Sequence, residues 1–215
     1  MKALANYREK FFEEWYQFND AVFFIIVCLL YFTILLLKRL LIISDIAAFE
    51  VLQERGEMWV FDLFFGLQYL SIPFFLAWKF TMTTFLIWVG CFMFGYKVTF
   101  AAMWKWVMFT ELIFVVPEFL KLLWFLIAGG DPGYQDVVAF YPLSLMNFVD
   151  HTAVDPRFHY PLKALNVFEA FYWFGLVVGV FYLSKKKWII SVYAVFTSYV
   201  LFFFLWLVFY VLVYK

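Results

Sequence analysis

The apolar stretch at residues 100–128 contains four ionisable residues, which are Lys105, Glu111, Glu118 and Lys121. An ionisable side chain at the bilayer centre costs at least about 2.5–3.5 kcal/mol on insertion scales, so intramembrane charges often mark functional sites. Glu111 and Glu118 are seven positions apart and therefore share one face of a helix. Two stacked carboxylates beside the helix-distorting Pro117 would suit a proton or cation pathway.

Two other interpretations compete for the same residues. In a structural interpretation, Lys105 and Lys121 extend towards opposite membrane surfaces, and Glu118 neutralises Lys121 three positions further along the helix. In a docking interpretation, the charges meet opposite charges on another membrane subunit. In each case Pro117 should distort the helix, because its ring provides no N–H donor for the carbonyl of Ile113 and clashes with that carbonyl.

Three more polar residues interrupt apolar segments, namely Asp62, Gln68 and Glu169. Asp62 and Glu169 lie near the starts of predicted spans, where a carboxylate reaches the headgroups and gains about 0.3–1 kcal/mol from the helix dipole. Gln68 is expected to hydrogen-bond across helices, a contact worth roughly 0.6–2 kcal/mol. We expect a structural role for both carboxylates.

Motifs for enzyme chemistry are absent from the sequence. His151 and His159 lie in the hydrophilic segment DHTAVDPRFHY, and their spacing matches no zinc-site signature, so we interpret them as loop residues. The chain has no phosphate-binding loop, no zinc-protease helix motif, no serine-nucleophile elbow and no pattern for phospholipid head-group transfer. We therefore predict a non-enzymatic protein without a cofactor or metal.

The composition predicts an integral membrane protein. Of 215 residues, 67% are hydrophobic, 27% aromatic and 15% charged, whereas an ordinary soluble domain is about 45–50% apolar and about 25% charged. The 16 basic and 16 acidic residues balance, which leaves no basic excess for nucleic acid. Cys28 and Cys91 lie in apolar runs and are interpreted as small hydrophobic residues rather than as a disulfide.

Continuous apolar runs predict an all-α, polytopic transmembrane helical bundle of about six spans rather than a barrel. This domain covers residues 21–214. The expected spans are 21–43, 58–78, 81–96, 100–128, 165–183 and 188–214. A very short connection around Lys79 separates the second and third spans. Residues 1–20 are expected to form an amphipathic helix at the membrane interface, and residues 129–164 an extramembrane loop.

The densest compact group of positive charge lies between the last two spans and consists of Lys185, Lys186 and Lys187. Short basic connections tend to face the cytoplasm. The long loop, in contrast, holds four aspartates against Arg157 and Lys163. We therefore expect the triple lysine in the cytoplasm and the long loop outside, and six spans then also place the amino terminus outside.

Two stretches carry a family resemblance. Residues 85–124 (FLIWVGCFMFGYKVTFAAMWKWVMFTELIFVVPEFLKLLW) combine an apolar span, a junction with Gly95 and Lys97, the aromatic Phe100, and a span with a central proline. Residues 165–193 (LNVFEAFYWFGLVVGVFYLSKKKWIISVY) combine a span, a short lysine-bearing link and the start of the last span. On these features, residues 58–214 resemble the Ypt-interacting-protein (Yip) family in its bacterial form.

The resemblance implies a multi-spanning helical bundle without enzyme activity, with its last inter-span link in the cytoplasm. Eukaryotic relatives assist membrane trafficking and bind small GTPases and one another. The first span and the amino-terminal helix lie outside the family core, and the loop at 131–164 is longer and more acidic than the family pattern. GTPase binding is therefore not carried over to this chain.

These observations together predict a Yip-like scaffold or accessory subunit of a membrane protein assembly, located in the bacterial inner membrane. Its expected partners are the lipid bilayer and other integral membrane proteins or a second copy of the chain, with no nucleic acid. The alternative is a small transporter or channel that uses Glu111 and Glu118 on the fourth span.

Overall fold

The computed structural model describes residues 18–43, 56, 58–128, 133–185 and 187–214. This part of the chain is all-helical, and its one β-type pairing is an isolated bridge between Ser144 and Asn166. The predicted amphipathic helix at 1–20 lies outside the described residues except for its last three positions, and Lys186 also lies outside them.

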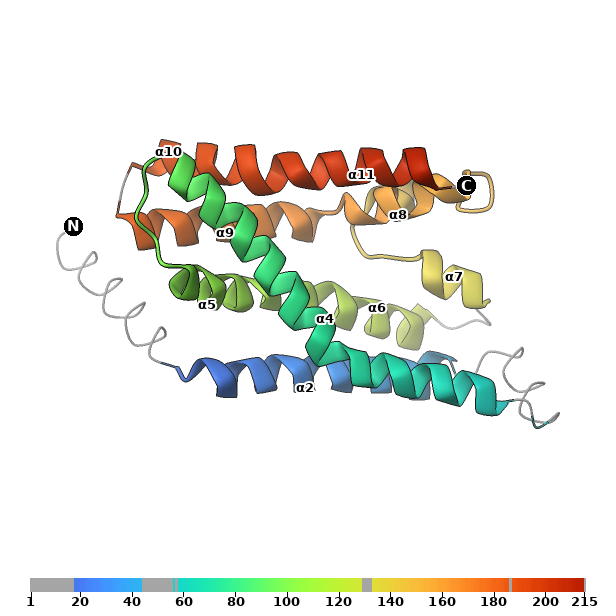
Figure 1. Cartoon of the computed structure of the whole chain (residues 1–215). Helices are drawn as coiled ribbons and strands as arrows, with labels where there is room; N and C mark the ends of the chain where they lie inside the picture. Colours follow the sequence, from blue (N-terminus) through green and yellow to red (C-terminus); the bar gives the residue numbers. More distant parts are fainter. Residues whose placement is uncertain (1–17, 44–55, 57, 129–132, 186, 215) are drawn as a thin grey trace.

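Five long helical segments run through the described part of the molecule (Figure 1). They are α2 (Asp20–Lys38) with the π-helical turn η1 (Arg39–Ile43); α4 (Met58–Met93); α5 (Phe100–Thr110), the 3-10 turn η2 (Glu111–Phe114) and α6 (Val115–Ala128); α9 (Val167–Ser184); and α10 (Trp188–Val195), the π-helical turn η4 (Phe196–Val200) and α11 (Leu201–Val213). Three short elements connect α6 to α9, namely α7 (Tyr134–Ala139), η3 (Leu145–Phe148) and α8 (Pro156–Ala164).

Among the described residues, four helices are long and apolar enough to cross a membrane, and they cover Asp20–Ile42, Met58–Met93, Val167–Ser184 and Trp188–Val213. Large apolar side chains point outward from them, as shown by Phe74 and Leu212, which are 71% and 78% exposed. Such surfaces fit an integral membrane protein whose outer face meets lipid. The segment from Phe100 to Ala128 is divided by η2 and does not belong to these four.

The connection expected around Lys79 is absent, because residues 58–78 and most of 81–96 form the single helix α4. This helix is about 54 Å long at 1.5 Å per residue. Figure 1 shows that its direction changes between its first and second halves. Pro73 lies inside the helix and explains the bend, since it cannot donate a hydrogen bond to the carbonyl of Tyr69.

Ion pairs define the two ends of the bundle. Asp20 at the start of α2 pairs with Lys105 on α5 at 2.7 Å, and Lys38 at the end of α2 pairs with Glu118 on α6. Helix α2 and the segment α5–α6 are therefore parallel, and we name the two ends the Lys105 end and the Glu118 end. Helices α4 and α9 run in the opposite direction and finish at the Lys105 end (Figure 1).

Small residues bring the helices close together inside the bundle. A Cβ atom added at Gly179 on α9 would lie 2.1 Å from the indole of Trp106 on α5, and one at Gly90 on α4 would lie 2.6 Å from the Ser198 hydroxyl. Gly175 and Gly179 form a G-x-x-x-G pattern, which permits close backbone approach between membrane helices. The contact fixes α5, and therefore η2, against α9.

Candidate functional site

Glu111 is the centre of a polar cluster between three helical segments. It is the first residue of η2 and is fully buried. Its Oε1 atom accepts hydrogen bonds from Lys79 Nζ of α4 at 2.5 Å and from the Tyr31 hydroxyl of α2 at 3.3 Å. Its Oε2 atom is buried and makes no hydrogen bond within the described part of the chain. The carboxylate thus keeps one free oxygen in the bundle interior.

Lys79 is held by an aromatic ring as well as by the carboxylate. Its Nζ lies 4.3 Å from the centroid of the Phe114 ring, a cation–π distance. The lysine side chain is 32% exposed, whereas that of Glu111 is 1% exposed. Removing one partner of a buried ion pair leaves an uncompensated charge, so Lys79 and Glu111 stabilise each other in this position.

A second contact between α2 and the segment α5–α6 lies seven residues further along each of them, and it is an ion pair. Lys38 of α2 pairs with Glu118 of α6, as Tyr31 of α2 bonds to Glu111. Residues seven apart share one face of a helix, so the two acids point towards the face of α2 that carries Tyr31 and Lys38. The pairing expected between Glu118 and Lys121 is wrong, because Lys38 reaches the carboxylate across the helix interface.

A cavity of about 340 Å³ lies between α2, α4 and α6, beside these pairs. Its polar lining comes from Tyr31, Lys38, Gln68, Ser71 and Glu118. Gln68 was expected to bond across helices, but its side chain makes no hydrogen bond to the described residues. Tyr31 belongs both to the cavity wall and to the Glu111 cluster, and it therefore links the cavity to the buried carboxylate.

Glu169 forms a second buried carboxylate site. The Asn166 side chain caps α9 by accepting a hydrogen bond from the Glu169 backbone N–H. The expected headgroup contact of this carboxylate is wrong, since Glu169 is only 7% exposed. Its Oε1 instead accepts hydrogen bonds from Trp173 Nε1 at 2.8 Å and from the Tyr199 hydroxyl at 3.1 Å.

Tyr172 lies between the two carboxylate sites. Its ring centroid is 4.9 Å from that of Phe114 beside Lys79, and 5.6 Å from that of Tyr199 beside Glu169. The side chain is completely buried, and its hydroxyl makes no hydrogen bond within the described residues. A buried polar atom without a partner is costly and calls for an explanation.

The remaining predicted site residues lie away from this cluster. Asp62 pairs with Arg39, and Lys105 pairs with Asp20 and donates to the carbonyl of Phe18. Lys121 forms no ion pair with the described residues. The expected helix distortion is present as η2, one turn before Pro117. Three of the four charges on 100–128 therefore have an opposite charge within the described part of this chain, and docking to another subunit stays a prediction.

His151 lies in the connection between η3 and α8, whereas His159, which was expected in a loop, lies in the helix α8, and both side chains are half-buried. His151 Nε2 lies 3.3 Å from Asp136, and His159 Nε2 lies 3.0 Å from the carbonyl of Val154. Hydrogen bonds from Thr152 lower the pKa of the neighbouring Asp150 carboxyl below its usual value. Among the described residues, no three His, Cys, Asp or Glu side chains form a group that would hold a metal ion.

Sequence reasoning missed Lys79, Tyr31 and Lys38 as members of the site. A detectable signal existed for two of them, because Tyr31 and Lys38 repeat the seven-residue spacing of Glu111 and Glu118. Lys79 was assigned to a connection, although a single charge in an otherwise apolar run is also the pattern of a buried pair. The role of the tyrosines near Glu169 has no local signal, since aromatic residues are abundant throughout.

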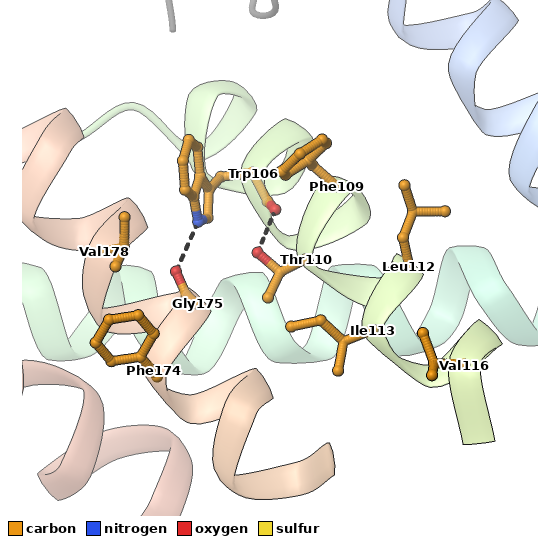
Figure 2. A pocket seen from close by; sticks show the side chains of 9 residues that line it. All are labelled: Trp106, Phe109, Thr110, Leu112, Ile113, Val116, Phe174, Gly175 and Val178. Carbon is orange, nitrogen blue, oxygen red and sulfur yellow. Dashed lines mark hydrogen bonds between the residues drawn. The ribbon is translucent and has the colours of Figure 1, made fainter. Parts of the chain in front are cut away.

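A separate apolar groove opens beside the cluster, between α5, η2 and α9 (Figure 2). Its volume is about 450 Å³, and its walls include Phe109, Ile113, Val116, Phe174 and Val178. Trp106 closes one side of the groove, and its Nε1 donates to the Gly175 carbonyl at 2.9 Å. The groove has the chemistry of a site for an acyl chain or an apolar side chain.

Comparison with protein-family models, with curated proteins and with solved structures finds no match for this chain. The resemblance to the Yip family stays a prediction from the sequence. The described residues define the class of protein: an all-helical protein with four helices long and apolar enough to span a membrane, and with a buried charged cluster between its helices.

Proposed function

We propose that this chain is a small transporter or channel of the bacterial inner membrane, with a pathway that leads from the cavity at Lys38 to Glu111. The observation that carries the proposal is the fully buried Glu111 carboxylate, which is paired with Lys79 and bonded to Tyr31. Ionisable residues inside a membrane protein are expensive and usually line ion or solute pathways. Taking the Phe100–Ala128 segment as a fifth crossing places Glu111 near the middle of the bilayer.

Irregular helical turns support this proposal. Glu111 begins the 3-10 turn η2, and Tyr199 lies in the π-helical turn η4. Short 3-10 and π-helical turns inside longer helices often occur at functional sites, and transporters commonly bind their substrate at interrupted helices near the midplane. The turn η2 contributes Glu111 to the polar cluster, and η4 contributes Tyr199 to the second carboxylate site at Glu169.

The cavity favours access from the Glu118 end. Its polar walls run from Lys38 and Glu118 towards Tyr31. Towards the Lys105 end, the fully buried side chains of Met103, Val107 and Met108 close the interior with apolar packing. Release to that side therefore requires a conformational change, as in alternating-access transport.

Flux measurements in proteoliposomes test this function. We expect the purified protein to carry protons, alkali cations or small organic solutes, and expect Glu118→Gln to remove most of that flux by breaking the Lys38 pair. Asp62→Asn is the matched control, because Asp62 belongs to an exposed ion pair away from the cavity. A folded wild-type protein that carries none of these species would overturn the proposal.

The groove in Figure 2 favours a second candidate, the Yip-like accessory subunit or scaffold. An apolar groove on the side of a membrane bundle accepts an apolar segment of another membrane protein through shape fit, because helix association in lipid depends on packing. Copurification after mild solubilisation tests this candidate. A specific partner that is lost in Val178→Trp, which fills the groove, would support it, and a clean monomer would count against it.

A further inference from the structure

We infer that the species handled at Glu111 is a proton, and that Glu169 is a second proton-binding carboxylate reached through Tyr172 and Tyr199. The inference rests on the proposed transport function and assigns its substrate. Its structural basis is a buried series of polar side chains on η2, α9 and η4, in which Tyr199 bonds to Glu169 and the buried Tyr172 lies between the two carboxylates.

Two polar atoms of this series have no hydrogen-bond partner within the described residues. Glu111 Oε2 and the Tyr172 hydroxyl are both buried and without hydrogen bonds within the described part of the chain. The Tyr199 hydroxyl already bonds to Glu169, and its ring packs edge-on against that of Tyr172. These free buried groups are costly in a purely structural core, but they are needed where hydroxyl rotation must pass a proton.

The transfer step balances without any other reactant. The Tyr172 hydroxyl makes no hydrogen bond at rest, so it must first come within hydrogen-bond reach of Tyr199 and Glu111. A protonated Glu169 then gives its proton to the Tyr199 oxygen, the Tyr199 hydroxyl proton passes to the Tyr172 oxygen, and the Tyr172 hydroxyl proton passes to Glu111 Oε2. Glu169 ends as a carboxylate and Glu111 as a carboxylic acid, while both tyrosines are unchanged. Protonation of Glu111 then removes the negative charge that holds Lys79.

The groups that face the two carboxylates come from all the packed elements. Glu111 is faced by Tyr31 of α2, Lys79 of α4 and Tyr172 of α9, and Glu169 by Tyr199 of η4. Tyr141, in the connection before η3, lies close enough to interact with both acids, and burial raises its pKa above the ordinary value. Four of these residues are tyrosines and the fifth is a lysine, so none of them adds an acidic side chain beside the two carboxylates.

A proton suits this geometry better than a metal cation does. Lys79 already neutralises Glu111 at Oε1, so an incoming metal ion would meet a positive ammonium beside its ligand. Neither the cavity at Lys38 nor the groove at Trp106 includes Glu111 or Glu169 in its walls. A proton needs no cavity, and it can bind at the free Oε2 atom.

Proton uptake by liposomes that contain a pH-sensitive dye is the first test. Tyr172→Phe removes only a hydroxyl, so the fold should be retained, and we expect loss of most of the proton flux. Tyr69→Phe is the matched control, because Tyr69 packs against Phe32 and is not part of the series. Full proton flux in Tyr172→Phe would overturn the inference.

Infrared difference spectroscopy in nanodiscs provides a readout that does not depend on flux. Titration should show two coupled carboxyl signals, one lost in Glu169→Gln and one lost in Glu111→Gln, with the remaining signal shifted in each variant. Solute flux without any effect of a proton gradient would overturn the proton assignment while transport stands. Coupled carboxyl signals without flux of any species would overturn transport while the shared proton site stands.

Discussion

Lys79 and Glu111 form an ion pair between two helices, and the two partners differ sharply in burial. The carboxylate side chain is 1% exposed, whereas the lysine side chain is 32% exposed. A long lysine side chain can extend towards a more polar region when its partner is lost, but the Glu111 carboxylate is enclosed on all sides. Loss of Lys79 and loss of Glu111 should therefore lower the stability of the protein by different amounts.

We predict that Lys79→Met destabilises the protein by about 3–5 kcal/mol, because it leaves the buried Glu111 charge without a partner. Glu111→Gln should cost less, because Lys79 can reorient. The double variant should recover most of the loss, since neither charge remains. Unfolding of each variant in nanodiscs measures these differences, and equal losses in the two single variants would contradict the asymmetry.

Gly179 provides a test of the α5–α9 contact. A methyl group at this position would lie 2.1 Å from two atoms of the Trp106 indole, so Gly179→Ala should cost about 1–3 kcal/mol through overpacking. Gly66→Ala is the control, because nothing lies within 4 Å of its added Cβ atom. That variant should be neutral or stabilising by about 0.5–1 kcal/mol, as expected for alanine in a helix. Thermal unfolding in detergent distinguishes the two.

The pair of Lys38 and Glu118 predicts a charge-reversal rescue. Both side chains are largely but not fully buried, at 16% and 23% exposure. Lys38→Glu alone places two acids together and should destabilise the bundle by more than the roughly 1 kcal/mol of an exposed pair. Lys38→Glu with Glu118→Lys should restore stability. If the double variant is no better than the single ones, the pair does not hold α2 against α6.

The unbroken α4 predicts the sidedness of the chain. With five crossings, Asn19, Lys97 and Lys185 lie on one side of the membrane, and Gly133 and His151 lie on the other. Single cysteines at these positions, in a background without Cys28 and Cys91, should react with a membrane-impermeant reagent accordingly. The five-crossing arrangement has an even number of crossings between Asn19 and Lys185, so both should be labelled from the same side. Labelling of these two positions from opposite sides would contradict it.

The distribution of charge predicts which side of the membrane faces the cytoplasm. Among the described residues, the Lys105 end carries Lys97, Lys105, Lys185 and Lys187 against the single acid Asp20. The Glu118 end carries five basic and five acidic residues, so its described charges balance. We expect the Lys105 end in the cytoplasm by the positive-inside tendency. This keeps the triple lysine where the sequence predicted it and moves the start of α2 to the same side.

The all-helical class and most helix positions follow from the sequence, because long apolar runs have few other stable forms in lipid. The break at Lys79 was wrong because local hydropathy cannot detect a counter-charge that lies 32 residues away. The partner predicted for Glu118 was wrong for a related reason. A nearby Lys121 satisfies helix spacing, but Lys38 on another helix forms the pair. The partners of Glu169 likewise depend on η4, which the sequence pattern does not mark.

The long sequence separation of these contacts determines the order in which they become possible during synthesis. Lys38 and Tyr31 each precede their acidic partner by 80 residues, which at roughly 5–20 residues per second is a delay of about 4–16 s. Each acid on the third long segment therefore emerges after its donors, including Lys79, have already left the ribosome. Newly made Glu111 therefore meets a lysine and a tyrosine that are already present, whereas Lys38 has no acidic partner on α6 until Glu118 has been made.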